Sequence, residues 1–213
     1  MVTGHDAIDD EMNELLKILR EARQKARGYA GFFQWPDRAR EELGVAQELA
    51  KTLERQQKNF MYSVKTRGRG YDPPDCEALD SHANKIALEI SELVDENAIR
   101  AAVRNLRSEP EERLAQEVVW ADWGLQKFSD AVTRLLVAKD RRFDSLKGGP
   151  FIGGYVVVLY SDEPALHRSV VEQYLEVTTF TPVIHISRAF LLLSYDPEFE
   201  GYPAFELKLS PDL

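Results

Sequence analysis

Three residues near the end of the chain have the types and spacing that metal-assisted hydrolysis uses. Asp196 follows one expected strand, and Glu206 and Lys208 lie two residues apart on the next. Two carboxylates on adjacent strands can hold a divalent ion, while a neighbouring lysine positions water or neutralises developing charge. These residues form a candidate catalytic set, and a divalent cation is the only cofactor that it implies.

The same pattern resembles the core of the PD-(D/E)xK metal-dependent nucleases. In that resemblance Asp196 corresponds to the first acid, Glu206 to the second and Lys208 to the lysine. The resemblance covers residues 196–208 and implies a nuclease or a related hydrolase that works through this hairpin.

A simpler cation site is a second interpretation of the hairpin. Asp196, Glu198 and Glu200 alternate before Gly201, as the oxygen ligands do at the start of an EF-hand calcium loop. The closing glutamate, Glu206, falls at the eleventh loop position instead of the twelfth, which excludes an EF-hand. Another metal site formed by Asp196, Glu198 and Glu206 stays open. The structural alternative is an acidic hairpin whose charges discourage pairing at a sheet edge.

Aromatic and basic residues suggest partner-binding sites elsewhere. Trp120 and Trp123 lie beside an apolar helical seam, and tryptophan is enriched at binding hot spots. The alternative for both is a buried face between helices. Arg67 and Arg69 belong to a basic segment, residues 65–71, that suits a phosphate or RNA contact. The alternative for this segment is a solvated helix end.

The histidines and the cysteine carry weaker signals. His167 and His185 are candidates to join a site in the C-terminal part, because histidine titrates near neutrality and ligates metals. Cys76 is the only cysteine, so no intrachain disulfide can form, which favours a reducing compartment.

Composition and charge limit the kinds of partner. The 213 residues carry a formal net charge of −9, which argues against a general binder of nucleic acid or of anionic membranes. Residues 148–213 contain nine acids and three bases, so this part is the more acidic one. No stretch approaches the roughly 18 apolar residues that a membrane-spanning helix needs, and no signal peptide is evident. We expect a cytoplasmic protein without a membrane partner.

The elements that would position these residues change in character near residue 148. Apolar residues recur at helical spacing over residues 8–26, 43–64, 79–106 and 114–135. Asp75 suits the N-cap of the third of these helices, and Ser108 with Glu111 forms a capping box before the fourth. The fourth stripe keeps its rhythm over about three heptads, as a bundle or coiled-coil seam does.

Strand-like runs follow the glycine-rich segment 148–154. Residues 155–160, 189–195 and 204–209 are rich in β-branched, aromatic and leucine residues, and residues 165–175 suit a short helix. The expected fold class is α+β. It consists of an antiparallel bundle of about four long helices, residues 1–147, followed by a small β-α-β-β unit, residues 148–213.

These observations favour a non-enzymatic interaction or regulatory protein. In this hypothesis a helical scaffold carries an acidic module that binds a protein partner or a second copy of the chain. The metal-dependent nuclease or hydrolase at the hairpin is the alternative from a different class. RNA association through residues 65–71 is a further one, although the net charge makes nucleic acid an unfavourable partner.

Overall fold

The computed structural model describes residues 30, 37–68, 70–107, 121–180 and 183–210. They belong to two compact units. The first unit combines residues 1–31 with residues 96–119, and its described helix is α3 (Glu96–Arg107). The second unit combines residues 32–95 with residues 120–213 and contains all other described helices and strands.

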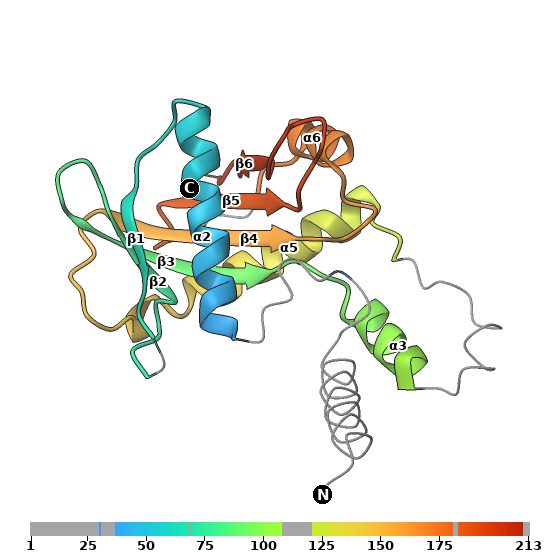
Figure 1. Ribbon diagram of the computed structural model, residues 1–213, viewed down its shortest axis with the longest axis horizontal. Helices are drawn as coiled ribbons and strands as arrows, with labels where there is room; N and C mark the ends of the chain where they lie inside the picture. Colours follow the sequence, from blue (N-terminus) through green and yellow to red (C-terminus); the bar gives the residue numbers. More distant parts are fainter. Residues whose placement is uncertain (1–29, 31–36, 69, 108–120, 181–182, 211–213) are drawn as a thin grey trace, which may run out of the picture. The chain divides into compact units, whose positions relative to one another are not determined.

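A six-stranded mixed sheet forms the centre of the second unit, with its strands in sequence order (Figure 1). The strands are β1 (Tyr62–Thr66), β2 (Cys76–Leu79), β3 (Lys85–Glu92), β4 (Gly154–Ser161), β5 (Arg188–Leu193) and β6 (Ala204–Glu206). Strands β1, β2 and β3 pair antiparallel, β4 and β5 continue parallel to β3, and β6 pairs antiparallel to β5.

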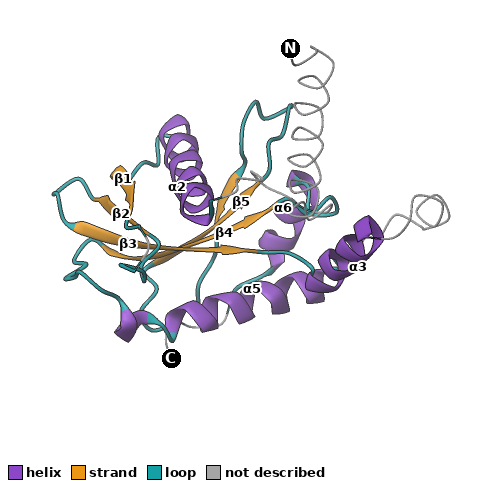
Figure 2. Cartoon of the chain, turned by 60° about the horizontal axis from the view of Figure 1, so that its bottom comes forward, coloured by secondary structure: helices purple, strands orange, loops and turns teal. Residues whose placement is uncertain are grey.

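Helices cover both faces of this sheet. Figure 2 shows α2 (Arg38–Arg55) on one face and α5 (Leu125–Asp140) on the other. Helix α6 (Arg168–Val177) packs beside α5, where the rings of Tyr174 and Phe128 lie 5.5 Å apart. A single turn of 3-10 helix, η1 (Phe143–Ser145), follows α5.

The core beneath α2 explains which side of each strand faces which helix. Ile86, Leu88 and Ile90 of β3 belong to this core, together with apolar residues of α2, β2, β4 and β5. Successive side chains of a strand point to opposite faces. Ala87 and Glu89 therefore point toward the face that α5 covers.

The predicted N-terminal helical bundle is wrong for the described residues, because β1, β2 and β3 lie within it. The first predicted helix, residues 8–26, lies outside the described residues, as does the capping box at residues 108–111. The second helix was expected to run through residues 43–64. It ends at Arg55, beyond which Gln57 has a φ of +57° that no helix accommodates.

The predicted third helix is in fact the β2–β3 hairpin followed by α3. Asp80 accepts hydrogen bonds from the backbone N–H groups of His82 and Asn84, which fixes the turn of this hairpin. Strand β3 is buried on both faces, so its apolar residues do not alternate cleanly with polar ones and match a helical spacing as well.

The predicted coiled-coil seam is also wrong in the part that the structure describes. Helix α5 begins only at Leu125, which is 40% exposed, and it buries Phe128, Ala131, Val132 and Leu136. Its apolar face is therefore broader than a heptad seam, because it packs on a sheet.

The predicted strands after residue 148 exist as β4, β5 and β6, and the short helix exists as α6. They do not form a separate sheet, because β4 pairs in parallel with β3 along seven residue pairs. One sheet thus takes strands from both sides of the predicted boundary at residues 147 and 148. No described helix is long and apolar enough to cross a lipid bilayer.

Candidate functional site

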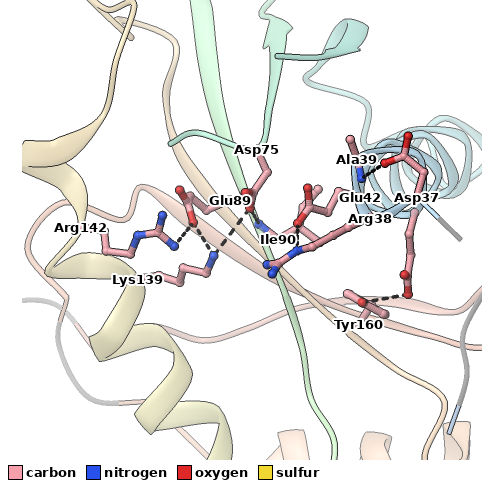
Figure 3. Close-up of polar contacts among 11 residues, drawn as sticks. Asp37, Arg38, Ala39, Glu42, Asp75, Glu89, Ile90, Lys139, Arg142 and Tyr160 are labelled. Atoms are coloured by element: carbon pink, nitrogen blue, oxygen red, sulfur yellow. Dashed lines mark hydrogen bonds and ion pairs between the residues drawn. The ribbon is translucent and has the colours of Figure 1, made fainter. Parts of the chain in front are cut away.

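Asp75, Glu89 and Lys139 meet on the side of the sheet that α5 covers (Figure 3). Asp75 directly precedes β2, and the pairing of Cys76 with Leu88 places it beside Glu89 on β3. Lys139 comes from the last turn of α5. Its ammonium group makes a short hydrogen bond to Oε2 of Glu89 and lies 3.6 Å from Oδ2 of Asp75.

All three charged side chains are buried. Glu89 is 0% exposed, Lys139 6% and Asp75 9%. Removing charges from water is costly, and such groups persist in proteins only when they are paired or bind ions. Burying these three charges therefore costs desolvation free energy that apolar residues in the same space would not cost.

The two carboxylates differ in how their oxygens are held. Oε2 of Glu89 accepts from Lys139 and lies 3.4 Å from the guanidinium of Arg142. Oδ2 of Asp75 accepts the backbone N–H of Ile90 at 2.8 Å. Oε1 of Glu89 is buried without a hydrogen-bond partner among the described residues. An unpartnered buried carboxylate oxygen is rare and costly, and it indicates a place for a cation or a water molecule.

Electrostatics at the cluster favour an added positive charge. Burial raises the pKa of Glu89; the charge of Lys139 opposes this shift and that of Asp75 reinforces it. Burial also raises the pKa of Glu42 on α2, and the negative charge of Asp75 adds to the effect. A cation placed among these carboxylates would favour their ionised forms and remove part of this cost.

A cavity of about 390 Å³ opens beside Asp75. It lies between the start of α2, the segment that connects β1 to β2, and Arg142 after α5. Its lining residues are Asp37, Arg38, Ala39, Glu42, Thr66, Gly68, Asp72, Asp75 and Arg142. Four of them are carboxylates and two are arginines, so the cavity suits a cation together with an anionic group.

Local contacts hold the α2 wall of the cavity. Asp37 is the N-cap of α2, and its Oδ1 accepts the N–H of Ala39 at 3.1 Å. Arg38 pairs with Glu42 at 2.7 Å along the helix. The hydroxyl of Tyr160 on β4 donates to Glu41 at 3.1 Å, which ties the start of α2 to the sheet (Figure 3).

The opposite wall is held by two basic residues. The ammonium group of Lys147 donates to the carbonyl of Asp72 at 2.6 Å. Arg67 donates to Glu77 at 2.6 Å and to the carbonyl of Lys147 at 2.5 Å, and its side chain is mostly buried. Arg67 therefore positions this wall, and Arg69 lies outside the described residues.

The predicted catalytic set of the C-terminal hairpin has other contacts. Oδ1 of Asp196 accepts the backbone N–H groups of Glu198 and Phe199, at 2.8 and 3.3 Å. Glu206 makes two hydrogen bonds with the guanidinium of Arg188, at 2.7 and 2.8 Å. Both carboxylates thus have structural partners, and Glu198 contributes an exposed side chain.

A separate cavity of about 510 Å³ near β6 brings Glu206 and Lys208 together. Asp196 does not line it. Across the described residues, no three or more His, Cys, Asp and Glu side chains converge as a complete metal-ligand set.

The predicted tryptophan site is partly described. Trp123 is 3% exposed, its carbonyl accepts the hydroxyl of Tyr174 at 2.8 Å, and Lys127 lies 4.7 Å from its ring centre. This residue contributes to packing against α6, and its indole is not open to a partner. Trp120 lies outside the described residues.

The sequence contains a signal for this cluster in the form of charged residues at positions where the pattern predicts apolar ones. Glu89 is the one charge in the apolar run from Ile86 to Ile90, and Lys139 lies on the buried face of α5. A charge inside an apolar run is unfavourable unless a partner lies opposite it. Comparison of the chain with protein-family models, curated proteins and solved structures found no match.

Proposed function

We propose that this protein is a metal-dependent phosphodiester hydrolase, a nuclease, whose active site contains Asp75, Glu89 and Lys139. The observation that carries this proposal is the buried Glu89, whose Oε1 has no partner among the described residues although Asp75 and Lys139 lie beside it. Of the three cluster residues, Asp75 lines the neighbouring cavity, so a substrate bound there would meet the cluster at Asp75.

Asp75 and Glu89 would hold the metal ion. Mg²⁺ is commonly bound through one or two carboxylates, with water and substrate phosphate completing its coordination, so two protein ligands suffice. When bound, such an ion lowers the pKa of water and polarises a phosphoryl oxygen.

The basic residues of the site have distinct roles. Lys139, held by Glu89, presents its remaining N–H donors to a water molecule or to the charge that develops on the phosphate. Arg142 is half exposed and lines the cavity, as does Arg38 from the start of α2. Guanidinium groups bind phosphate oxygens in a two-point manner, so these arginines orient the anionic substrate.

The residue set supports the nuclease class that the sequence resembles, at a different place in the chain. Pro74-Asp75 and Glu89-Ile90-Ser91 follow the order of the PD-(D/E)xK pattern, with Ser91 where that pattern has lysine. The ammonium group of Lys139 on α5 supplies the missing charge. We therefore place the metal-dependent cleavage at Asp75, Glu89 and Lys139. The hairpin residues Asp196, Glu206 and Lys208 form the alternative site, against which this assignment is tested.

The other sequence-based hypotheses stay predictions. If the contacts of Lys139 with Asp75 and Glu89 only stabilise the fold, the hypothesis of a non-enzymatic interaction protein is favoured. RNA association through residues 65–71 would need its basic side chains to contact phosphate. Arg67 is already paired with Glu77, which disfavours this role for Arg67.

The first prediction concerns metal-dependent cleavage. The full chain, stripped of metal with EDTA and supplied with Mg²⁺ or Mn²⁺, is expected to cleave DNA, RNA or bis(p-nitrophenyl) phosphate. Asp75→Asn and Glu89→Gln are expected to lower cleavage at least about 100-fold, as the loss of a key transition-state contact does. Mn²⁺ binding, followed by electron paramagnetic resonance or calorimetry, should weaken in both variants.

Glu206→Gln is the matched control, because it makes the same charge change at the hairpin. It should leave cleavage unchanged. Circular dichroism checks that each variant folds, and Glu89→Gln combined with Lys139→Met avoids an unpaired buried ammonium group. Unchanged cleavage in folded Asp75→Asn would overturn the proposal, and a loss confined to Glu206→Gln would favour the hairpin set instead.

A further inference from the structure

Asp140 follows Lys139 directly, and its carboxylate collects three consecutive backbone N–H groups. Oδ1 accepts from His185 at 2.8 Å and from Ile186 at 3.2 Å, while Oδ2 accepts from Ile184 at 3.3 Å. The segment 184–187 before β5 is thereby bonded to the end of α5.

The same segment reaches Lys139 along a second path through Tyr155. The carbonyl of Tyr155 accepts both the backbone N–H and the hydroxyl of Ser187, at 2.8 and 2.9 Å. The hydroxyl of Tyr155 then donates to the carbonyl of Lys139 at 2.9 Å. Both the backbone of Lys139 and its neighbour Asp140 are therefore fixed to residues 184–187.

Ring packing closes the arrangement. The imidazole of His185 stacks on Phe143 of η1, with ring centres 4.3 Å apart and planes 13° apart. Phe143 in turn packs against Tyr155 at 5.6 Å. Nδ1 of His185 lies 3.6 Å from Oδ2 of Asp140. Three kinds of contact thus converge on the last turn of α5.

An acidic residue at this place needs an explanation. The C-terminal end of a helix has partial negative charge, so an acidic residue such as Asp140 is unfavourable there. Helix ends also fray more readily than strand interiors, and Lys139 has a long flexible side chain. A catalytic lysine at a helix end therefore needs more contacts to fix its position than a lysine within a strand.

We infer that Asp140 is a positioning residue, with Tyr155 as its counterpart, which together fix the end of α5 so that the ammonium group of Lys139 lies between Asp75 and Glu89. This inference rests on the proposed function, because it assigns a purpose to the position of Lys139. Asp140 directly follows Lys139, and the hydroxyl of Tyr155 donates to the carbonyl of Lys139, so both act through Lys139.

The second prediction separates positioning from binding. Asp140→Ala is expected to lower kcat about 10–100-fold, because small misplacements of a catalytic group carry costs of this size. KM and the Kd for Mn²⁺ should stay within about twofold, because Asp75, Glu89 and the arginines keep their contacts. Asp140→Asn should recover part of kcat, because its amide oxygen still accepts from His185 and Ile186.

Asp80→Ala is the matched control. Asp80 also accepts backbone N–H groups of a turn, those of His82 and Asn84 in the β2–β3 hairpin, but makes no hydrogen bond to Lys139 among the described residues. It should leave kcat unchanged. Tyr155→Phe removes only the hydroxyl that bonds to the carbonyl of Lys139, and it replaces Asp140→Ala as the test if that variant does not fold.

The outcomes distinguish the two proposals. Normal kcat in folded Asp140→Ala, or an equal loss in Asp80→Ala, overturns the positioning role while metal-dependent cleavage by the parent protein stands. Cleavage that is absent from the parent protein itself overturns both.

Discussion

At the scale of single residues, two glutamates show how position decides what a carboxylate does. Glu89 is surrounded by protein, and burial raises its pKa even though Lys139 bonds to it. The two hydrogen bonds from Arg188 instead lower the pKa of Glu206 at the sheet edge. A cation bound beside Glu89 would stabilise its ionised form, which burial disfavours. The ionised form of Glu206 is already stabilised by Arg188.

The third prediction uses Glu42, whose carboxylate lines the cavity and whose pKa is raised by burial and by Asp75. Since the folded protein holds this proton more tightly, the contribution of Glu42 to the free energy of unfolding is fully present below the ordinary glutamate pKa of 4.5 and is lost as the pH rises through the folded pKa. In metal-free protein, Glu42→Gln should therefore reduce the loss of stability between about pH 4 and about pH 7.

Glu206→Gln provides the opposite case for the same measurement. Its folded pKa is lowered, so its contribution is present above the ordinary value of 4.5 and disappears as the pH falls through the folded pKa. This variant should lose about 0.2–1 kcal/mol near neutral pH and nothing in acid. Urea unfolding over a pH series measures both. Parallel pH curves for parent and Glu42→Gln would contradict the interpretation of the cavity carboxylates.

Asp75 shows why a residue-level assignment from sequence failed. Its position before an apolar stretch predicts a helix N-cap, and that prediction is wrong because β2 follows it. Its carboxylate accepts the backbone N–H of Ile90 on the neighbouring strand, not one in its own segment. The donor is fifteen residues away in sequence, so only strand pairing reveals it.

At the scale of elements, α5 differs most from its sequence-based prediction, because it packs on a sheet where the heptad pattern predicts a partner helix. A strict heptad stripe predicts that Leu135 faces a partner helix. The structure instead buries Leu136 and leaves Leu135 at intermediate exposure. This orientation turns Lys139 toward Glu89, because residues three apart share a helix face.

The fourth prediction compares these adjacent leucines. Leu136→Ala should lower the free energy of unfolding by about 2–5 kcal/mol, the usual cost of a buried leucine truncation. Leu135→Ala makes the identical chemical change at a less buried place and should cost clearly less. Chemical denaturation of both variants gives the difference. A greater loss at Leu135 would support the coiled-coil seam and contradict the sheet-facing orientation.

At the scale of the whole molecule, one sheet joins two parts of the chain that the sequence pattern assigns to different domains. Strand β3 pairs with β4 from Ile86↔Gly154 to Glu92↔Tyr160, across residue 147. Parallel neighbours need a long connection, which is why the two strands are so far apart in the chain. The candidate site also combines α2, β2, β3 and α5, all from before this residue.

The fifth prediction follows from this pairing. A fragment of residues 1–147 would expose the edge of β3 that pairs with β4 and would lack the core residues of β4 and β5. It should lack a cooperative unfolding transition and show poor dispersion in its amide NMR spectrum, whereas the full chain shows both features of a folded protein. A fragment that unfolds cooperatively would favour the predicted domain boundary at residues 147 and 148.

The sequence by itself determined the elements whose signals are local. The apolar runs predict β4 and β5, since each is a short block of β-branched, leucine and aromatic residues. The apolar stripe from Leu43 to Leu53 predicts most of α2, because helical spacing is read within one segment. Net charge and the single cysteine likewise depend on composition alone.

Only the tertiary structure decided what brings distant charges together. Asp75, Glu89 and Lys139 are spread over 65 positions, and their meeting depends on the β2–β3 register and on the face that α5 presents to the sheet. The closeness of the hairpin acids in sequence predicts a catalytic set, and this role stays a prediction. In the structure, Glu206 accepts from the guanidinium of Arg188, and Asp196 accepts the backbone N–H of Glu198 in its own turn. Proximity along the chain is a local property, whereas burial and pairing of charges arise when the whole sheet assembles.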